Sequence, residues 1–457
     1  MLVIISDLHL KDGTSGSSIT PDAFSVFGER LRSMAYRASW RADGRYEPLR
    51  SIDLLLLGDA FDLIRSERWL VNATGEVETI RPWDHPQGNA YAEKITEITE
   101  AILEHNRAGF ELLKRISRGE TVQLPPATQA GQPDHNSAER IPLTVRIHYM
   151  VGNHDWFFHL PGPKYDAIRQ RVVDTLGLAN SAELFPYHPE ESPFIMKLFR
   201  DYRVYARHGD QFDKMNYDAD AGRDASTVGD AMTIDLLTRF PYEVRRQTGT
   251  RLPLELSEGL KELSNIRPAI VTPLWVNNLV NNYASDPEQS TFIKNIWDTA
   301  AEEFLQTGFV RSHDRWLAFD AVDGLEEALF FAKGLSFDAM SKLAGWANQK
   351  LWGADKISIA ENALKESAYQ DRTADYIIYG HTHFHEIAPL DTYFDNSVMH
   401  NQIYINSGTW HSYYDMTMQA PDKLKFVGMH VMTYLAFFKD DERGGKHFEA
   451  WSGSLSQ

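Results

Sequence analysis

The chain has 457 residues, a formal net charge of −18 and no cysteine, and this length predicts two domains or one domain with large insertions. The lack of cysteine excludes disulfides and thiolate metal sites, so any metal would be held by His, Asp, Asn or Glu. The acidic charge disfavours general nucleic-acid binding, but it leaves open a nuclease whose metals neutralise the phosphate locally.

A hydrophobic fraction of 43% and a charged fraction of 24% are typical of a soluble globular protein. No apolar run is long enough to span a bilayer. Met1 leads directly into an apolar run with no basic segment ahead of it. These features predict a cytoplasmic chain with no signal peptide and no transmembrane segment.

The first predicted element is a buried strand, because Leu2–Ile5 is a continuous apolar and β-branched run. Asp7 and His9 follow it directly. If the backbone stays extended there, both side chains point to the same side of the strand. A carboxylate and an imidazole that converge in this way can hold a metal, although such a pair alone more often caps a turn.

Apolar residues at helical spacing predict a helix over Phe24–Ala38, with Pro21-Asp22 as its start. The next buried strand, Ser51–Asp59, again ends in a carboxylate. A helix between two apolar strands forms a βαβ unit, which predicts that the two strands are parallel.

A long helical pattern covers Asn89–Arg118, and the polar, Pro-rich stretch 121–141 predicts an exposed loop. The third strand, Leu143–Val151, runs into Gly152-Asn-His-Asp155. A third strand that ends in residues able to bind a metal strengthens the interpretation of the first two.

A helix is predicted over Lys164–Leu178, followed by short strands over Phe194–Tyr202 and Arg203–Arg207. The second of these strands leads into His208. From about residue 221 to 368 the pattern is almost wholly helical and rich in aromatic residues. We interpret these aromatic side chains as the core of the helical block rather than as a groove for acyl chains or a base.

Strand patterns return over Asp375–His383, 402–410 and 427–438. Strands at both ends of the chain predict one α/β core that is interrupted by a helical insertion, because both strand groups are needed to complete one site. The predicted units are a core of residues 1–215, with a helical insertion at about 65–140, an inserted helical cap over 216–370, and the second part of the core over 371–457.

Five apolar strands share one property, since each is followed by residues that can bind a metal. Taken singly, each residue has an ordinary structural explanation, but five such strand ends are improbable by coincidence, and sites in α/β sheets lie at the carboxyl ends of strands. The ligands suffice for two divalent cations that clamp a phosphoryl group, with a carboxylate such as Asp59 as a bridge. The candidates are Asp7, His9, Asp59, Asn153, His154, His208, His381 and His383.

In chain order, Asp7-Leu-His9, Gly58-Asp59, Gly152-Asn-His-Asp155, His208 and Gly380-His-Thr-His383 resemble the motifs of the calcineurin-like metallophosphoesterases. The segments that carry the resemblance make up roughly half of the chain, and the helical blocks lie outside it. The resemblance implies an α+β, four-layer fold: a central β-sandwich flanked by helices, with a dinuclear site at one edge and an inserted all-α cap.

The resemblance also implies a ligand set for two divalent metal ions. Mn is the preferred ion and Fe, Zn, Ni or Co are alternatives, because His and carboxylate ligands suit these better than Mg or Ca. The implied ligands are Asp7, His9 and His383 for the first metal, Asn153, His208 and His381 for the second, and Asp59 as the bridge.

His154 is implied not as a ligand but as the group that donates a hydrogen bond or proton to the phosphate or leaving group, with Asp155 orienting it. The implied reaction is hydrolysis of a phosphomonoester, phosphodiester or pyrophosphate bond by in-line attack of a metal-bound hydroxide. The alternatives are a nuclease of the same fold and a non-catalytic metal-binding scaffold.

Three stretches, Asp7-Leu-His-Leu10, Gly58-Asp-Ala-Phe-Asp62 and His208-Gly-Asp-Gln-Phe-Asp213, look most like the branch with UDP-2,3-diacylglucosamine pyrophosphohydrolases. Two features depart from that branch. His154 stands where arginine is typical, and the insertion after His208 is far larger. The retained His154 favours a general phosphomonoesterase or phosphodiesterase over that branch. The expected partner is a phosphorylated small-molecule or lipid-linked substrate.

Three further carboxylates, Asp12, Asp62 and Asp210, lie close to these motifs. Each is expected either to orient a histidine ligand or to cap a turn. Three histidines outside the motifs, His85, His159 and His313, are interpreted as structural or surface residues.

Overall fold

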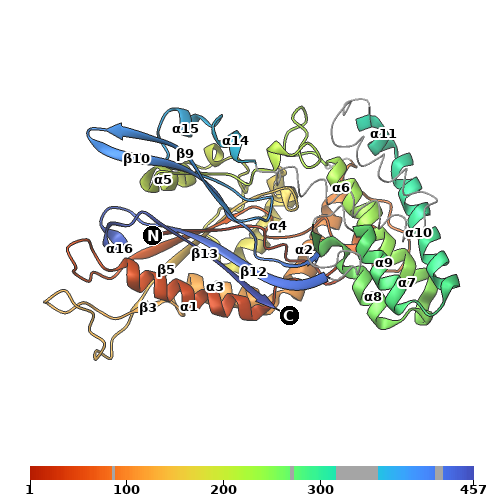
Figure 1. Ribbon diagram of the computed structural model, residues 1–457, viewed down its shortest axis with the longest axis horizontal. Helices are drawn as coiled ribbons and strands as arrows, with labels where there is room; N and C mark the ends of the chain where they lie inside the picture. The colour runs from red at the N-terminus through yellow and green to blue at the C-terminus, as the bar shows by residue number, and fades with distance from the viewer. Residues whose placement is uncertain (85–87, 268–271, 315–358, 417–425, 457) are drawn as a thin grey trace.

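The computed structural model describes residues 1–84, 88–267, 272–314, 359–416 and 426–456. Two mixed β-sheets form its centre, helices cover them, and a group of helices stands at one end (Figure 1). The architecture is therefore mixed α/β, which is compatible with the α+β class expected from the sequence.

The larger sheet has seven strands, of which β5, β2 and β1 are parallel, whereas β12 is antiparallel to β1. In the four-stranded sheet, β6, β8 and β10 are parallel and β9 is antiparallel to β10. The larger sheet contains, in spatial order, β5 (Thr144–Met150), β2 (Ser51–Leu57), β1 (Leu2–Ile5), β12 (Phe426–Phe437), β11 (Ser412–Met416) and β7 (Ile266–Arg267), with β13 (Phe448–Ser456) paired to β12. The smaller sheet contains β6 (Val204–Ala206), β8 (Tyr376–Tyr379), β10 (Val398–Asn406) and β9 (Glu386–Asp395).

β1 is buried on both faces because alternate residues enter two different cores. Val3 and Ile5 pack with the helices on one side of the larger sheet, whereas Leu2 and Ile4 pack with the smaller sheet on the other side. This double burial explains the continuous apolar run of the sequence. The helices on the first side are α1 (Pro21–Ala38), α2 (Asn89–His105), α3 (Arg107–Ser117) and α4 (Pro163–Leu176).

The smaller sheet is also covered on both faces. Its outer face packs Ile377 and Tyr404 against α14 (Ala360–Ala363) and α15 (Ser367–Gln370). The described core thus has four layers, namely helices, larger sheet, smaller sheet and helices. The predicted βαβ unit is confirmed, because α1 joins β1 to β2 and the two strands are parallel.

Two predicted elements differ from the structure. The segment 194–202, predicted as a strand, belongs to helix α5 (Pro193–Tyr202). The Ser192 side chain accepts a hydrogen bond from the backbone N–H of Ile195 and caps this helix, and the buried residues recur at helical spacing. The predicted long helix over 89–118 is divided at Asn106, whose side chain donates to the carbonyl of Lys11 over 2.8 Å.

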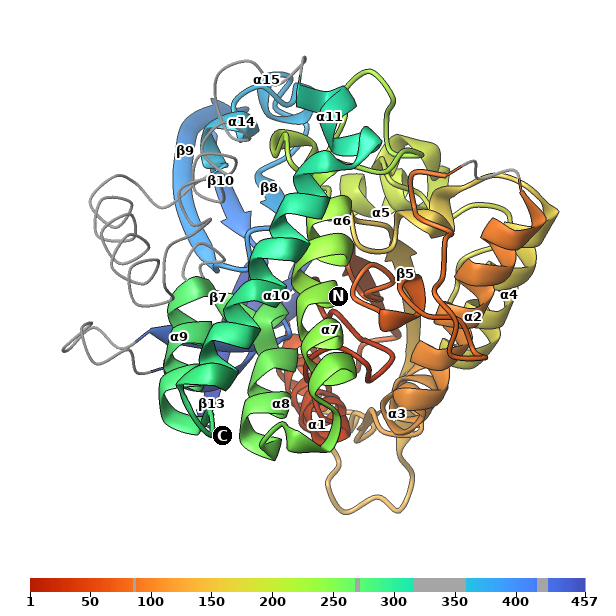
Figure 2. The ribbon, with the colours of Figure 1, turned by 90° about the vertical axis from the view of Figure 1, so that its right-hand side faces the viewer.

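The helical block stands at the carboxyl ends of the parallel strands, as Figures 1 and 2 show. Trp275 and Trp297 are buried in its own core, as predicted for them. The other tryptophans of the stretch, Trp316, Trp346 and Trp352, lie outside the described residues. The block is not purely helical, because β7 joins the larger sheet beside β11. Its described helices are α6 (Val228–Met232), a π-helical turn (Thr233–Thr238), α7 (Arg239–Thr248), α8 (Leu254–Lys261), α9 (Thr272–Tyr283), α10 (Pro287–Gln306) and α11 (Gly308–Asp314).

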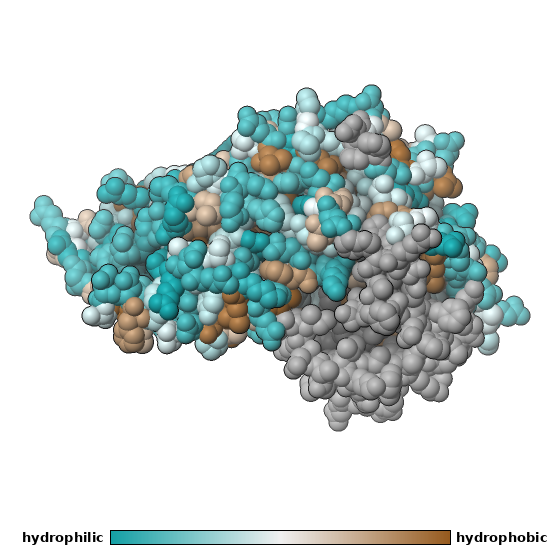
Figure 3. All heavy atoms as spheres, turned by 90° about the horizontal axis from the view of Figure 1, so that it is seen from above, coloured by the Kyte–Doolittle hydropathy of each residue, from teal (hydrophilic) through white to brown (hydrophobic). Residues whose placement is uncertain are grey.

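The described surface in Figure 3 is mainly hydrophilic, with apolar residues in small scattered groups. Within the described ranges, no helix has both the length and the apolar character that crossing a membrane requires.

Candidate metal centre

Five strands end at one place in the molecule. β1, β2 and β5 belong to the larger sheet, and β6 and β8 belong to the smaller sheet. Backbone hydrogen bonds join the segments after them: Asp7 donates to the carbonyl of Gly58 over 3.1 Å, and Gly380 donates to that of His208 over 2.8 Å. The edge shared by the two sheets therefore collects the residues that the sequence proposes as ligands.

The backbone at these residues is not extended. Asp7, His9, Asp59, His381 and His383 all have left-handed backbone, with φ between 45° and 66°. Such a conformation costs about 1–3 kcal/mol in a residue other than glycine and concentrates at functional sites. The backbone does not stay extended at the end of β1, so the condition under which Asp7 and His9 would share one side of the strand is not met. Turns rather than strand periodicity bring these side chains together.

Two motif glycines make room for the candidate ligands. A Cβ atom at Gly58 would lie 2.4 Å from Nδ1 of His208, and one at Gly152 would lie 2.4 Å from Oδ1 of Asp59. Both distances are far inside van der Waals contact, so a side chain at either position would displace a ligand. This close approach explains why glycine stands directly before Asp59 and Asn153.

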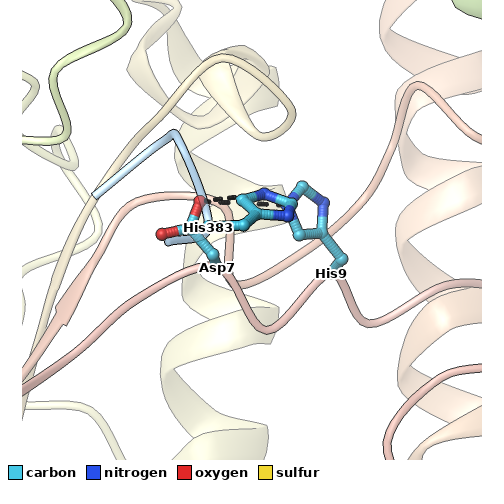
Figure 4. A group of neighbouring side chains, drawn as sticks. All are labelled: Asp7, His9 and His383. Atoms are coloured by element: carbon cyan, nitrogen blue, oxygen red, sulfur yellow. Dashed lines mark hydrogen bonds and ion pairs between the residues drawn. The ribbon is translucent and has the colours of Figure 1, made fainter. Parts of the chain in front are cut away.

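Asp7, His9 and His383 form the first group, drawn in Figure 4. Nε2 of His9 lies 2.9 Å from Nε2 of His383. Oδ1 of Asp7 lies 3.3 Å from Nε2 of His383 and 3.9 Å from Nε2 of His9. The three side chains converge on one small volume, as the resemblance implies for the first metal.

Asp59, His208 and His381 form a second group, to which Asn153 adds its amide oxygen. Oδ1 of Asn153 lies 3.2 Å from Nε2 of His208 and 3.0 Å from Nδ1 of His381. Oδ2 of Asp59 lies 3.3 Å from Nε2 of His208 and 3.6 Å from Nε2 of His9. Asp59 thus faces both groups, and the structure brings all seven proposed ligands together.

These separations fit ligands that share a cation. Two ligands about 2.0–2.2 Å from one ion, at angles of about 90–110°, lie about 2.8–3.6 Å apart. Nearly all the distances in the two groups fall in this range. Oδ1 of Asp7 adds support, because it is buried and accepts no hydrogen bond from the described residues. A buried carboxylate oxygen without a hydrogen bond is costly unless a cation compensates it.

Asp62 orients two histidines at once. Its Oδ2 lies 3.0 Å from Nδ1 of His9, and its Oδ1 lies 2.8 Å from Nδ1 of His154. Because a carboxylate accepts, both Nδ1 atoms carry a proton and both Nε2 atoms are directed toward the centre. Arg65 donates its backbone N–H to the same carboxylate over 3.1 Å. Of the two interpretations of Asp62, the contacts support orientation of a ligand.

Asp155 does not orient His154, and that prediction is wrong. Its carboxylate accepts hydrogen bonds from the backbone N–H groups of Gly152 and Ala60, over 2.6 and 2.8 Å, and from the hydroxyl of Tyr149 over 2.6 Å. Asp155 therefore fixes the two loops that follow β2 and β5. Burial, with a contribution from the nearby charge of Asp59, raises the pKa of Asp155 to about 7.

His154 lies at the border of the first group. Its ring centroid is 4.6 Å from that of His9, and its side chain is 12% exposed, so a bound substrate can reach it. His9, Asp59 and His154 are also close enough together to hold an ion. The geometry therefore accommodates His154 both as a proton donor and as a ligand.

Asp213 is a residue of the centre that the sequence analysis missed. Its Oδ2 lies 3.0 Å from Nε2 of His381, which leaves Nδ1 of His381 facing Asn153. Asp213 orients His381 in the way that Asp62 orients His9. The available signal was its position five residues after His208, at the end of a stretch already noted for the resemblance.

The two other neighbouring carboxylates are structural. Asp12 accepts from the hydroxyl of Ser66 over 2.6 Å and from the backbone N–H of Thr14 over 3.0 Å, which is a turn-capping contact. Asp210 forms a buried ion pair with Arg223. Within the described residues, neither carboxylate is hydrogen bonded to a proposed ligand.

Burial and charge act in opposite directions in this cluster. Burial, reinforced by the neighbouring His154, lowers the pKa of His9 to about 3, so His9 is neutral and offers a lone pair. Burial also disfavours the charged form of His208, but the carboxylates of Asp59 and Asp7 raise its pKa well above the ordinary value. The buried carboxylates thus attract positive charge to the centre.

Neither a protein family model nor a curated protein matches this chain. The assignment of the centre therefore depends on its own residues and their geometry.

His159 lies outside the centre and is structural, as predicted, whereas His85 and the side chain of His313 lie outside the described part of the chain. Its Nδ1 lies 2.5 Å from Asp224 and its Nε2 lies 3.2 Å from Glu191. Burial lowers the pKa of His159, but hydrogen bonds to the two carboxylates outweigh burial and raise it to about 9.

We expect His159→Gln to destabilise the protein at pH 6 but not at pH 10. The pKa of about 9 in the folded state exceeds the unfolded value of about 6.5, so the ion pair stabilises the fold fully below about pH 6.5. This contribution is lost as the pH rises through about 9. The expected loss at pH 6 is about 1–2 kcal/mol, because Asp224 is partly exposed. Urea unfolding at both pH values measures it, and an equal loss at both would contradict it.

Proposed function

We propose that this protein is a phosphohydrolase with a dinuclear metal centre, of the calcineurin-like metallophosphoesterase type. The observation that carries the proposal is the pair of ligand groups that share Asp59, whose Oδ2 lies 3.6 Å from Nε2 of His9 and 3.3 Å from Nε2 of His208. Two cations bridged by one carboxylate are suited to clamp a phosphoryl group. The chain order of the motifs and the four-layer core with ligands from both sheets support the family and its fold.

Two bound divalent cations would polarise the phosphoryl oxygens and lower the pKa of a water molecule. Mn is the preferred ion, with Fe, Zn, Ni or Co as alternatives, because the ligands are imidazole, carboxylate and amide groups. The side chains that would hold them are those of Asp7, His9, Asp59, Asn153, His208, His381 and His383.

His154 would donate a hydrogen bond or a proton to the substrate. The carboxylate of Asp62 accepts a hydrogen bond from Nδ1 of His154 over 2.8 Å, and its negative charge would stabilise an imidazolium formed during the reaction. Nε2–H of that imidazolium can donate to a phosphate oxygen or to the leaving group. Asp155 would support the site indirectly, because its carboxylate holds the backbone of the loops after β2 and β5.

The proposed substrate is a phosphomonoester, phosphodiester or pyrophosphate of a small molecule or a lipid-linked group. A nucleic-acid substrate is less well supported, because the chain is acidic overall and three of the four arginines of the basic cluster 239–251 form ion pairs. Arg239 pairs with Glu303, Arg245 with Glu67, and Arg246 with Glu243. A basic channel along a nucleic-acid backbone needs unpaired cationic side chains.

We expect the purified protein to bind about two equivalents of Mn²⁺ and to hydrolyse bis-p-nitrophenyl phosphate or p-nitrophenyl phosphate. A chelator should abolish turnover, and added Mn²⁺ should restore it. Elemental analysis together with release of p-nitrophenol measures both. A protein that binds no divalent ion and turns over neither ester would refute the enzyme hypothesis, whereas binding without turnover would favour the scaffold alternative. Comparing mono-, di- and pyrophosphate esters then identifies the substrate class.

A further inference from the structure

Asn265 is a residue of the helical block that reaches the surroundings of the metal centre. It ends the 3-10 turn Glu262–Asn265 and directly precedes β7. His411 precedes β11 in the same way, and β7 and β11 are parallel neighbours with Ile266 beside Tyr414. The strand pairing therefore brings the segments before β7 and β11 next to one another, and Asn265 and His411 are both fully buried.

The side-chain amide of Asn265 is hydrogen bonded at both ends. Its Oδ1 lies 2.6 Å from Nζ of Lys11 and 2.9 Å from Nε2 of His411. Its Nδ2 donates to Oε2 of Glu262 over 2.6 Å and to the carbonyl of Ser17 over 3.3 Å. Because the ammonium group of Lys11 can only donate, the amide atom that faces it is the oxygen, which fixes the orientation of the amide.

This orientation sets the tautomer of His411. An amide oxygen only accepts, so Nε2 of His411 carries the proton. The ring centroid of His411 lies 5.3 Å from that of His9 and 6.2 Å from that of His383. His411 is thus packed against two of the three residues of the first metal group. Lys11 follows His9 by two positions on the same loop.

We propose that Asn265 is a positioning residue through which the helical block holds His411 against the first metal group. The proposal rests on the proposed function, because it concerns the binding of a metal by that group. Asn265 joins three segments, namely the loop after β1, its own 3-10 turn and the segment before β11. A buried amide with this many hydrogen bonds is costly to disturb, so the first metal group depends on the helical block as well as on the strands.

The test uses the full chain in metal-free form. We expect Asn265→Ala to weaken the binding of one of two Mn²⁺ equivalents by about tenfold or more, and to leave the other equivalent unchanged. Calorimetric titration with Mn²⁺ measures both events. The ¹⁵N spectrum of the imidazoles gives a readout without metal, because the Nε2–H tautomer of His411 should lose its dominance. His411→Gln identifies that signal by its disappearance.

Two further variants separate positioning from folding. The double variant Asn265→Asp with Glu262→Gln keeps a carboxylate oxygen at position 265 as the acceptor for Lys11 and His411. The new amide at position 262 donates to the second carboxylate oxygen, so the hydrogen bond between the two side chains is kept with its direction reversed. Both Mn²⁺ equivalents should therefore bind with affinities within about threefold of wild type. Val276→Ala, in the core of the block, should lower thermal stability without changing Mn²⁺ binding.

The outcomes distinguish two kinds of failure. The positioning role would be overturned if Asn265→Ala bound Mn²⁺ as the wild type does, or if Val276→Ala lost as much Mn²⁺ affinity as Asn265→Ala. A wild-type protein that binds neither Mn²⁺ nor any of the alternative divalent ions would overturn the proposed function, and the positioning role with it.

Discussion

Asp59→Asn is expected to disrupt the paired metal centre and to lower turnover of bis-p-nitrophenyl phosphate by about 10³-fold or more. The Oδ2 atom of Asp59 faces both ligand groups, 3.6 Å from Nε2 of His9 and 3.3 Å from Nε2 of His208. Asparagine has nearly the same size and tolerates the left-handed backbone at this position, where φ is 52°. It lacks the negative charge that holds two cations close together. Elemental analysis should therefore find one equivalent of metal or less.

Asp53→Asn is the matched control for this variant. Asp53 lies on the same strand, β2, and is buried, but it pairs with Arg146 and His148 over 2.8 and 3.0 Å rather than with the centre. Its substitution should reduce thermal stability and leave turnover per folded molecule unchanged. If Asp59→Asn kept both metal ions and wild-type turnover, the bridging role of Asp59 would be wrong, and hydrolysis would not depend on a paired metal centre.

The sequence predicts well, where the signal is local, which side chains gather at the shared edge of the two sheets. Leu2–Ile5 and 54–57 are short apolar runs that favour buried strands. The polar residues after them stand in short motifs, in which glycine directly precedes Asp59 and Asn153. The structure adds the physical reason for those glycines, because a Cβ atom at Gly152 would collide with Asp59. Local patterns of this kind need no knowledge of the partners across the fold.

The sequence does not predict which side chains contact one another when the partners are far apart in the chain. Asp155 stands next to His154, yet the carboxylate that orients His154 is Asp62, 92 positions away in the chain. Likewise, Asn265 contacts Lys11, which is 254 positions away in the chain, and no hydrophobic periodicity predicts such a contact. Helix α5 is a different case, because the sequence contains signals for both structures. Ser192 and Pro193 are typical of a helix start, but the aromatic and branched residues after them also suit a strand.

Asp62→Asn should lower turnover by about 10²-fold or more, together with a loss of metal affinity at the first group. One carboxylate accepts from Nδ1 of His9 over 3.0 Å and from Nδ1 of His154 over 2.8 Å. An asparagine amide presents one acceptor and one donor, so it can satisfy only one of these imidazoles in its present tautomer. The other ring must change tautomer or turn away, and either change takes a metal ligand or the proton donor out of position. Calorimetric Mn²⁺ titration and steady-state kinetics measure the two losses.

Asp12→Asn is the control that separates orientation from general loss of a loop carboxylate. Asp12 is also buried on a loop beside the centre, but it accepts from Ser66 and Thr14 and contacts no proposed ligand among the described residues. Its substitution should change turnover by less than about threefold, because the Asp12 carboxylate caps a turn and does not orient a histidine. Equal losses in the two variants would show that Asp62 acts only through the stability of its loop. A large loss in Asp62→Asn alone, with normal thermal unfolding, is the result expected if this single carboxylate couples the first metal group to the proton donor.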